Sequence, residues 1–114
     1  AVFVRPDLNT MMFVNEGGFL EHKQPGFPNE YAKLGEPWAA WVDAADRGLG
    51  IWCPHAREIT CYRVRNGNKG DCSYLAPLQT FALSPGLVFE YECALLMGSV
   101  DEIRQGFKTL KPQP

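Results

Sequence analysis

Short apolar segments separated by polar turns dominate the chain, and this pattern predicts β-strands. Side chains alternate between the two faces of a strand, so runs of four to eight residues rich in Val, Ile, Tyr, Phe and Trp are typical of strands. A proline- and glycine-containing stretch, 23–37, predicts a long loop instead. The predicted strands are 2–4, 11–14, 19–22, 38–43, 49–53, 58–65, 72–75, 79–83 and 88–97.

One helix is predicted near the C-terminus. Ser99 and Glu102 have the spacing of a capping box, in which each side chain accepts a hydrogen bond from the other residue's backbone N–H. Ile103, Phe107 and Leu110 then form one apolar stripe, and the helix is expected to end at Lys111-Pro112. The fold class expected is all-β: an antiparallel sandwich or jelly roll with one short C-terminal helix, forming a single domain over residues 1–114.

The segments 38–43 and 49–53 are predicted to form a hairpin. If Val42 and Ile51 point to the core, alternation places Trp41 and Trp52 on the opposite face, in water. Two indoles on a common face would form a flat apolar strip on which a sugar ring stacks. In this hypothesis, replacing either tryptophan with alanine weakens glycan binding at least about tenfold without unfolding the domain.

Other residues are expected to complete this surface. Pairing Asp43 with Gly48 makes the two indoles diagonal neighbours, and Tyr62 extends the strip if its strand lies beside the hairpin. Polar side chains at the rim would bind sugar hydroxyls. The predicted ligand-binding residues are Trp41, Trp52, Tyr62, Asp43, Asp46, Arg47 and Arg63.

Four cysteines permit two disulfides. A two-residue turn at Asn66-Gly67 would place Cys61 opposite Cys72, within bonding reach, and would leave Cys53 and Cys93 as the second pair. The alternative is four free thiols in a cytosolic protein.

The charge balance excludes some partners. With 11 Lys and Arg against 13 Asp and Glu, the net charge is −2, and no basic stripe is available for phosphates. We therefore expect neither nucleic-acid binding nor docking to an acidic membrane, and no apolar run reaches the roughly 20 residues needed to span a bilayer. The start at Ala1 without a visible signal peptide favours a processed chain or an excised piece.

Candidate chemical groups are sparse. Glu90 and Glu92 share one strand face, about 6.7 Å apart, which fits a glycosidase carboxylate pair but also any solvated strand. His22 and His55, with Glu21, are the residues for a transition-metal site, although the chain has no His-x-His or His-x-x-x-His spacing that would bring two ligands onto one element. No Gly-x-Ser-x-Gly sequence marks a nucleophile.

An oxygen-rich loop follows the predicted Asn66-Gly67 turn. Asn66, Asn68 and Asp71 offer calcium ligands, but they lack the order of a calcium-binding loop. A simple turn is favoured, with the calcium alternative left open. No cofactor and no catalytic residue is predicted.

An ordered set of segments resembles β-sandwich parts of secreted bacterial proteins that act on polysaccharides. The likeness covers about residues 36–107, and its segments are 36–43, 48–54, 76–81, 85–91 and 98–104. The resemblance implies a secreted, non-catalytic carbohydrate-binding module that accompanies a catalytic module. No catalytic residue of such a family can be matched to a position of this chain.

Three hypotheses follow. The first is a secreted carbohydrate-binding module for a plant-type polysaccharide, with β-glucan favoured. The second is a small glycan-active enzyme, either a hydrolase or lyase that uses Glu90 and Glu92 or a metal-dependent oxidase that uses His22 and His55. The third is a cytosolic sandwich whose exposed tryptophans bind a protein.

Overall fold

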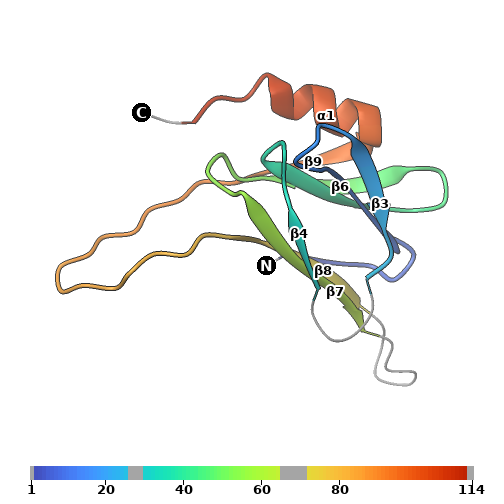
Figure 1. Cartoon of the computed structure of the whole chain (residues 1–114). Coiled ribbons are helices and arrows are strands. Elements are labelled where there is room, and N and C mark those ends of the chain that lie inside the picture. The colour runs from blue at the N-terminus through green and yellow to red at the C-terminus, as the bar shows by residue number, and fades with distance from the viewer. Residues whose placement is uncertain (1, 26–29, 65–71, 113–114) are drawn as a thin grey trace.

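The computed structural model describes residues 2–25, 30–64 and 72–112. In these residues the chain forms two sheets in which every pair of neighbouring strands is antiparallel (Figure 1). The four-stranded sheet has the order β1 (Val2–Val4), β8 (Cys72–Leu78), β7 (Glu58–Val64), β4 (Glu30–Lys33). The five-stranded sheet has the order β3 (Leu20–Lys23), β2 (Thr10–Val14), β5 (Trp38–Val42), β6 (Arg47–Trp52), β9 (Ala94–Ser99).

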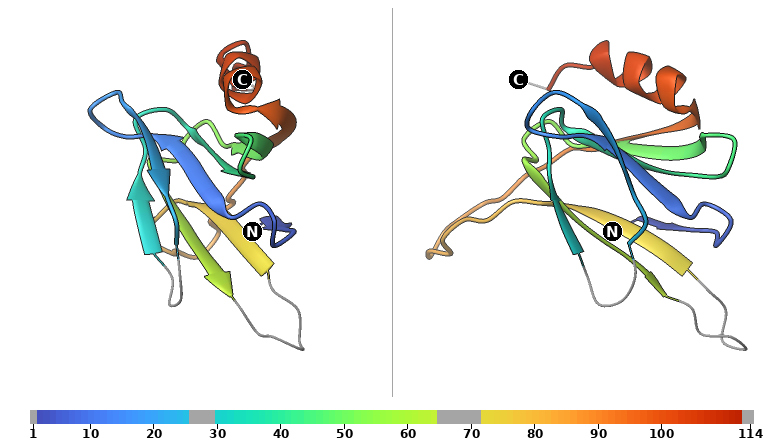
Figure 2. Two further views of the ribbon diagram at one scale, coloured as in Figure 1. Left: turned by 90° about the vertical axis from the view of Figure 1, so that its right-hand side faces the viewer. Right: turned by 45° about the vertical axis from the view of Figure 1, so that its right-hand side comes forward.

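The two sheets face each other, and α1 (Val100–Lys108) lies on the outer side of the five-stranded sheet (Figure 2). One apolar core fills the space between the sheets and includes Met11, Trp41, Ile59 and Leu75. A second core, between the five-stranded sheet and the helix, includes Val42, Trp52, Ile103 and Phe107. The predicted class, an all-β sandwich with one short C-terminal helix, is confirmed.

The start of α1 is fixed by the predicted capping box. The Glu102 backbone N–H donates to Ser99 Oγ and the Ser99 backbone N–H donates to Glu102 Oε1, each at 3.2 Å. Ile103 and Phe107 are buried against the sheet as expected. The helix ends at Lys108, earlier than predicted. Thr109 is its C-cap, and Leu110 lies beyond the last turn.

Glycines allow the helix to lie close to the sheet. A Cβ atom added at Gly50 of β6 would lie 2.5 Å from Ile103 Cγ2 and 2.9 Å from Phe107 Cε2. A Cβ atom at Gly106 of α1 would lie 2.3 Å from Leu96 Cδ2 of β9. A side chain at Gly50 would therefore press on Ile103 and Phe107 of the helix, and one at Gly106 would displace the end of the Leu96 side chain.

Three strand predictions are wrong. The predicted loop 23–37 contains β4, which pairs with β7 through Ala32 opposite Ile59. The segment 79–83 forms no strand, and the predicted strand 88–97 begins only at Ala94. Residues 79–93 instead form a long arm that projects from the body between β8 and β9 (Figure 1).

Candidate functional site

The tryptophan hairpin forms, but its indoles are not on the surface. Trp41 is 0% exposed and Trp52 is 5% exposed. Trp41 lies with Ile51 in the core between the sheets, whereas Trp52 lies with Val42 beneath the helix. The predicted stacking surface is therefore wrong, and the same burial removes these tryptophans as a contact for a partner protein.

The error has two physical causes. The register pairs Val42 with Gly48 and Trp38 with Trp52, one residue away from the expected pairing of Asp43 with Gly48. A slip of one residue moves a strand's side chains to the other face. In addition, both faces of β5 are covered: α1 lies over the face of Val42, and the four-stranded sheet faces Trp41.

The predicted rim residues of the hairpin build its turn and hold the helix. Asp43 Oδ1 accepts from the backbone N–H groups of Ala45 (2.8 Å) and Arg47 (3.2 Å). Asp46 adopts φ 58°, and its carbonyl accepts from the N–H of Val100 at 3.0 Å. Arg47 Nη1 lies 3.3 Å from Glu102 Oε1. Asp43 therefore holds the turn itself, and Asp46 and Arg47 have structural partners at the start of α1.

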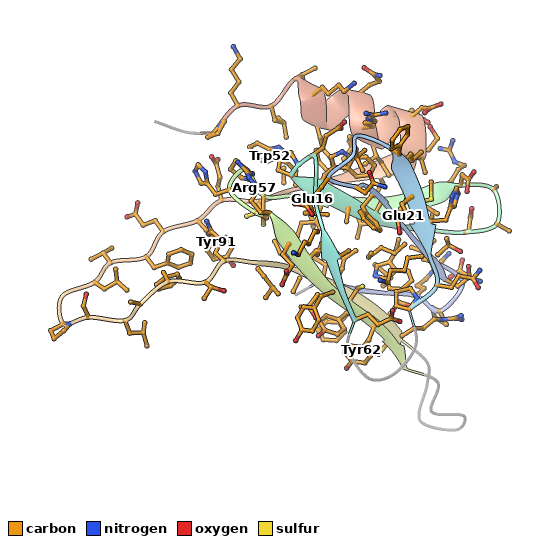
Figure 3. The ribbon with its side chains drawn as sticks, in the orientation of Figure 1. Glu16, Glu21, Trp52, Arg57, Tyr62 and Tyr91 are labelled. Atoms are coloured by element: carbon orange, nitrogen blue, oxygen red, sulfur yellow. The ribbon has the colours of Figure 1, made fainter. Side chains whose placement is uncertain are left out.

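Tyr62 and Arg63 lie on the other sheet, so the predicted ligand set does not come together. Figure 3 shows Trp52 and Tyr62 at separate places on the two sheets. Arg63 Nη2 donates to the Pro6 carbonyl at 2.9 Å and ties the β1–β2 connection to β7. Tyr62 faces outward, as the alternation with buried Ile59 and Cys61 predicts.

Around Tyr62 the structure forms an aromatic surface that was not predicted as a unit. Tyr62 pairs with Tyr74 of β8, and Tyr74 pairs with Phe3 of β1, so the three rings follow one line across three strands. The ring centroids of Tyr62 and Tyr74 are 4.3 Å apart at 78°, and those of Phe3 and Tyr74 are 5.5 Å apart at 25°. Phe3 is exposed at the sheet edge.

Tyr31 extends this line onto the fourth strand. It pairs with Thr60, which lies two residues from Tyr62 on the same face of β7, and its side chain is exposed. We call Phe3, Tyr74, Tyr62 and Tyr31 the aromatic row. In the described part of the chain the only helix lies on the five-stranded sheet, so the face that carries the row is not covered by it (Figure 2).

Charged groups lie at the Tyr31 end of the row. Lys33 pairs directly with Glu58 on the same outward face, where opposite charges across a strand pair are favourable. An ammonium and a carboxylate beside exposed rings are groups that bind hydroxyls. The only part of the row that the sequence predicted was Tyr62, whose side chain alternation along β7 directs outward. The other three rings come close to it only through the pairing of β1, β8, β7 and β4.

The cysteines are free thiols, and the predicted disulfides are wrong. Cys61 pairs with Leu75, and Cys72 pairs with Val64, so the expected register of this hairpin is shifted and the two sulfurs do not face each other. Burial raises the pKa of the Cys61 thiol to about 11, and burial also raises that of Cys53. Both therefore stay protonated and unreactive near neutral pH.

The turn Asn66-Gly67 and the calcium candidates Asn66, Asn68 and Asp71 lie outside the described residues. Glu90 and Glu92 lie on the projecting arm, and His22 and His55 are exposed on β3 and after β6. Among residues 2–25, 30–64 and 72–112, no three His, Cys, Asp or Glu side chains come together as a metal site would require. No helix in these ranges is both long and apolar enough to cross a membrane.

Comparison of the chain with protein families, with curated proteins and with solved structures finds no match.

Proposed function

We propose that this protein is a non-catalytic binding module that holds a polysaccharide on the aromatic row. The observation that carries the proposal is the alignment of four aromatic side chains across β1, β8, β7 and β4 on an outward sheet face. The binding surface is this row. Trp41 and Trp52 belong to the two cores and take no part in it.

The chemistry of the row suits sugar rings. Aromatic side chains offer apolar surface and, in tyrosine, a hydroxyl that exchanges hydrogen bonds with the ligand. Neighbouring strands lie about 4.8 Å apart, so a row across four strands spans roughly 14 Å. An elongated chain of rings uses such a span better than a single small molecule does. Rings held on a sheet also lose little conformational freedom on binding.

The nature of the ligand follows from the resemblance to parts of secreted bacterial polysaccharide-active proteins. It implies a plant-type glycan, with β-glucan favoured, a secreted protein, and a catalytic module as neighbour. The alternative of a small glycan-active enzyme receives no support from the placement of its residues, because Glu90 is exposed on the arm and His22 and His55 are exposed on different parts of the chain.

The test compares variants at the two exposed ends of the row with a matched aromatic elsewhere. Phe3→Ala and Tyr31→Ala are each expected to weaken retention on a β-glucan affinity gel by about threefold to tenfold, which corresponds to the loss of one stacking contact. Phe81→Ala removes an exposed aromatic of the arm and should leave retention unchanged. Unfolding curves show that all three variants are folded.

Two results would contradict the proposal. The first is a wild-type protein that no polysaccharide in a broad panel retards. The second is equal retention of all three variants on the gel, because binding would then use another surface.

A further inference from the structure

The sandwich is open along one side. The five-stranded sheet faces a sheet of four strands, and β1 lies near β6, because Val4 and Leu49 line one cavity and Val2 and Ile51 line another. Leu95 and Met97 of β9 pair with Ile51 and Leu49, which places them on the face that looks toward the other sheet. They are nevertheless 56% and 78% exposed. In the described residues no strand covers this face of β9.

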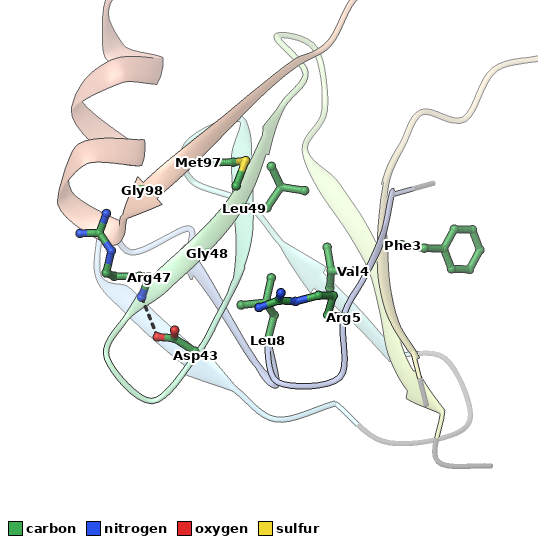
Figure 4. Close-up of a pocket in the computed structure, with 10 residues that line it drawn as sticks. All are labelled: Phe3, Val4, Arg5, Leu8, Asp43, Arg47, Gly48, Leu49, Met97 and Gly98. Carbon is green, nitrogen blue, oxygen red and sulfur yellow. Dashed lines mark hydrogen bonds between the residues drawn. The ribbon is translucent and has the colours of Figure 1, made fainter. Parts of the chain in front are cut away.

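Cavities follow this open side. One, of about 560 Å³, is lined by Val4, Leu8, Leu49 and Met97, with Arg5 and Arg47 at its margin (Figure 4). Another, of about 290 Å³, lies at the base of the arm and is lined by Val2, Ile51 and Cys93. Together they form what we call the open groove, between the edge strands β1 and β9.

The arm carries exposed apolar side chains of the kind that this groove could accommodate. Figure 3 shows Tyr91 on the arm near its base, and Tyr91 and Phe89 line the smaller cavity of this groove. Leu87, Phe89 and Tyr91 alternate with Val88 and Glu90, which is the pattern of a strand with one apolar face. All five side chains are exposed, and no strand pairing is formed within 79–93. The segment therefore has the sequence of a strand but forms no strand pair in its own chain, where Phe89 stacks on Phe81 and Tyr91 instead.

We propose that the returning half of the arm, 87–93, occupies the open groove of a second copy of this chain. It would add a strand beside the free edge of β1, opposite β9, so that five strands face five. This inference goes beyond glycan binding. Because Phe3 lines the larger cavity and also ends the aromatic row, the variants that test the groove lie at other residues.

The exposed area is large enough for such an interface. Phe81, Phe89 and Tyr91 are 44%, 47% and 69% exposed, which amounts to roughly 320 Å² at about 200 Å² per aromatic side chain. Leu83, Leu87 and Val88 on the arm, and Leu95 and Met97 in the groove, add several exposed aliphatic side chains. The total approaches the roughly 800 Å² that each partner contributes to an interface of standard size.

The test measures molar mass by sedimentation velocity over a range of concentrations. The wild-type chain is expected to sediment as two or more copies. Leu87→Asp on the apolar face of the arm, and separately Met97→Asp in the groove, should each raise the dissociation constant at least about tenfold. These side chains are 44% and 78% exposed, so the folded monomer should persist, and Phe19→Asp is the control at an exposed position elsewhere.

Mixing the two defective proteins gives the decisive result. The Met97→Asp protein keeps an intact arm, and the arm variant keeps an intact groove, so a mixture should form a complex that neither forms alone. A wild-type chain that stays at single-copy mass overturns the inference, as does assembly that survives Met97→Asp. Occupation of the groove by a different protein while the chain remains monomeric also overturns it. Glycan retention is measured separately, so either proposal can fail without the other.

Discussion

At the scale of the residue, the tryptophans show how strongly burial on both sides of a sheet changes the role of a side chain. Trp41 and Trp52 lie on opposite faces of one hairpin, and each face is covered, one by the four-stranded sheet and the other by α1. Their indoles therefore stabilise the fold. A residue of this kind is a poor probe of binding, because its removal affects the whole structure.

Trp41→Ala and Trp52→Ala are each expected to lower the free energy of unfolding by about 3–5 kcal/mol, since large cavities form in closely packed cores. Urea denaturation followed by far-UV circular dichroism measures this change. Phe19→Ala, at an exposed position, should change stability by less than about 0.5 kcal/mol. Tryptophan variants as stable as the wild type would show that the indoles are not buried.

Glu36 joins three parts of the molecule. Arg104 Nε of α1 and Trp38 Nε1 of β5 both donate to Glu36 Oε1, each at 3.0 Å. The hydrogen bonds from Arg104 are the main reason that the pKa of Glu36 is lowered from its ordinary value. Because the pKa of Glu36 is lower in the folded protein than in the unfolded chain, its ionised carboxylate stabilises the fold. This stability is fully present above the pKa of the unfolded chain and is lost as the pH falls through the pKa of the folded protein.

Glu36→Gln is therefore expected to cost about 1–3 kcal/mol at neutral pH, because the charge-assisted bonds to Arg104 become neutral. The difference between variant and wild type should shrink as the pH is lowered through the acidic range. Urea unfolding at a series of pH values measures both effects. A difference that stays constant down to strongly acidic pH would contradict the role given to the Glu36 charge.

At the scale of the element, the packing of α1 against the sheet requires a glycine, Gly50, beneath the helix. Gly50 leaves the space that Ile103 and Phe107 occupy, and Ser99 with Glu102 fixes where the helix begins. The two features act together: the cap sets the helix start beside the hairpin turn, and the glycine sets its distance from the sheet.

Gly50→Ala is expected to destabilise the fold by about 1–3 kcal/mol, since the added methyl group overlaps the positions of Ile103 Cγ2 and Phe107 Cε2. In an Ile103→Ala background the same substitution should cost less, because the nearest atom has been removed. A double-mutant cycle from thermal unfolding measures this coupling. Equal costs in both backgrounds would show that the helix does not lie on Gly50.

The sequence predicted most elements because their signals are local. The capping box, the alternation of β7 and the Trp38 hairpin are all visible in short windows of sequence. The faces could not be assigned in the same way, because the placement of α1 over β5 is a long-range feature. The hairpin register was missed because the Asp43 side chain bonds the turn and places its own backbone opposite Arg47.

The candidate site was predictable only in part. The outward direction of Tyr62 followed from Cys61 and Ile59 beside it. Its neighbours did not, because Phe3, Tyr74 and Tyr31 lie far apart in sequence and meet through strand pairing. The arm was predicted as two strands because its alternation is that of a strand, although it pairs with nothing in the described chain.

At the scale of the whole molecule, the helix leaves two surfaces for function. It covers the outer face of the five-stranded sheet, so the aromatic row on the four-stranded sheet and the open groove between β1 and β9 remain (Figure 2). The row is fixed on paired strands, whereas the arm extends away from the body. A rigid surface suits a repeating polymer, and an extended segment suits exchange between copies.

The most direct measurement of the central claim is a titration of isotope-labelled protein with soluble β-glucan oligosaccharides, followed by amide and aromatic chemical shifts. The account predicts that the shifts change along the aromatic row, at Phe3, Tyr31, Tyr62 and Tyr74. Spectra that do not change with any oligosaccharide, or changes confined to the arm or the helix, would contradict it.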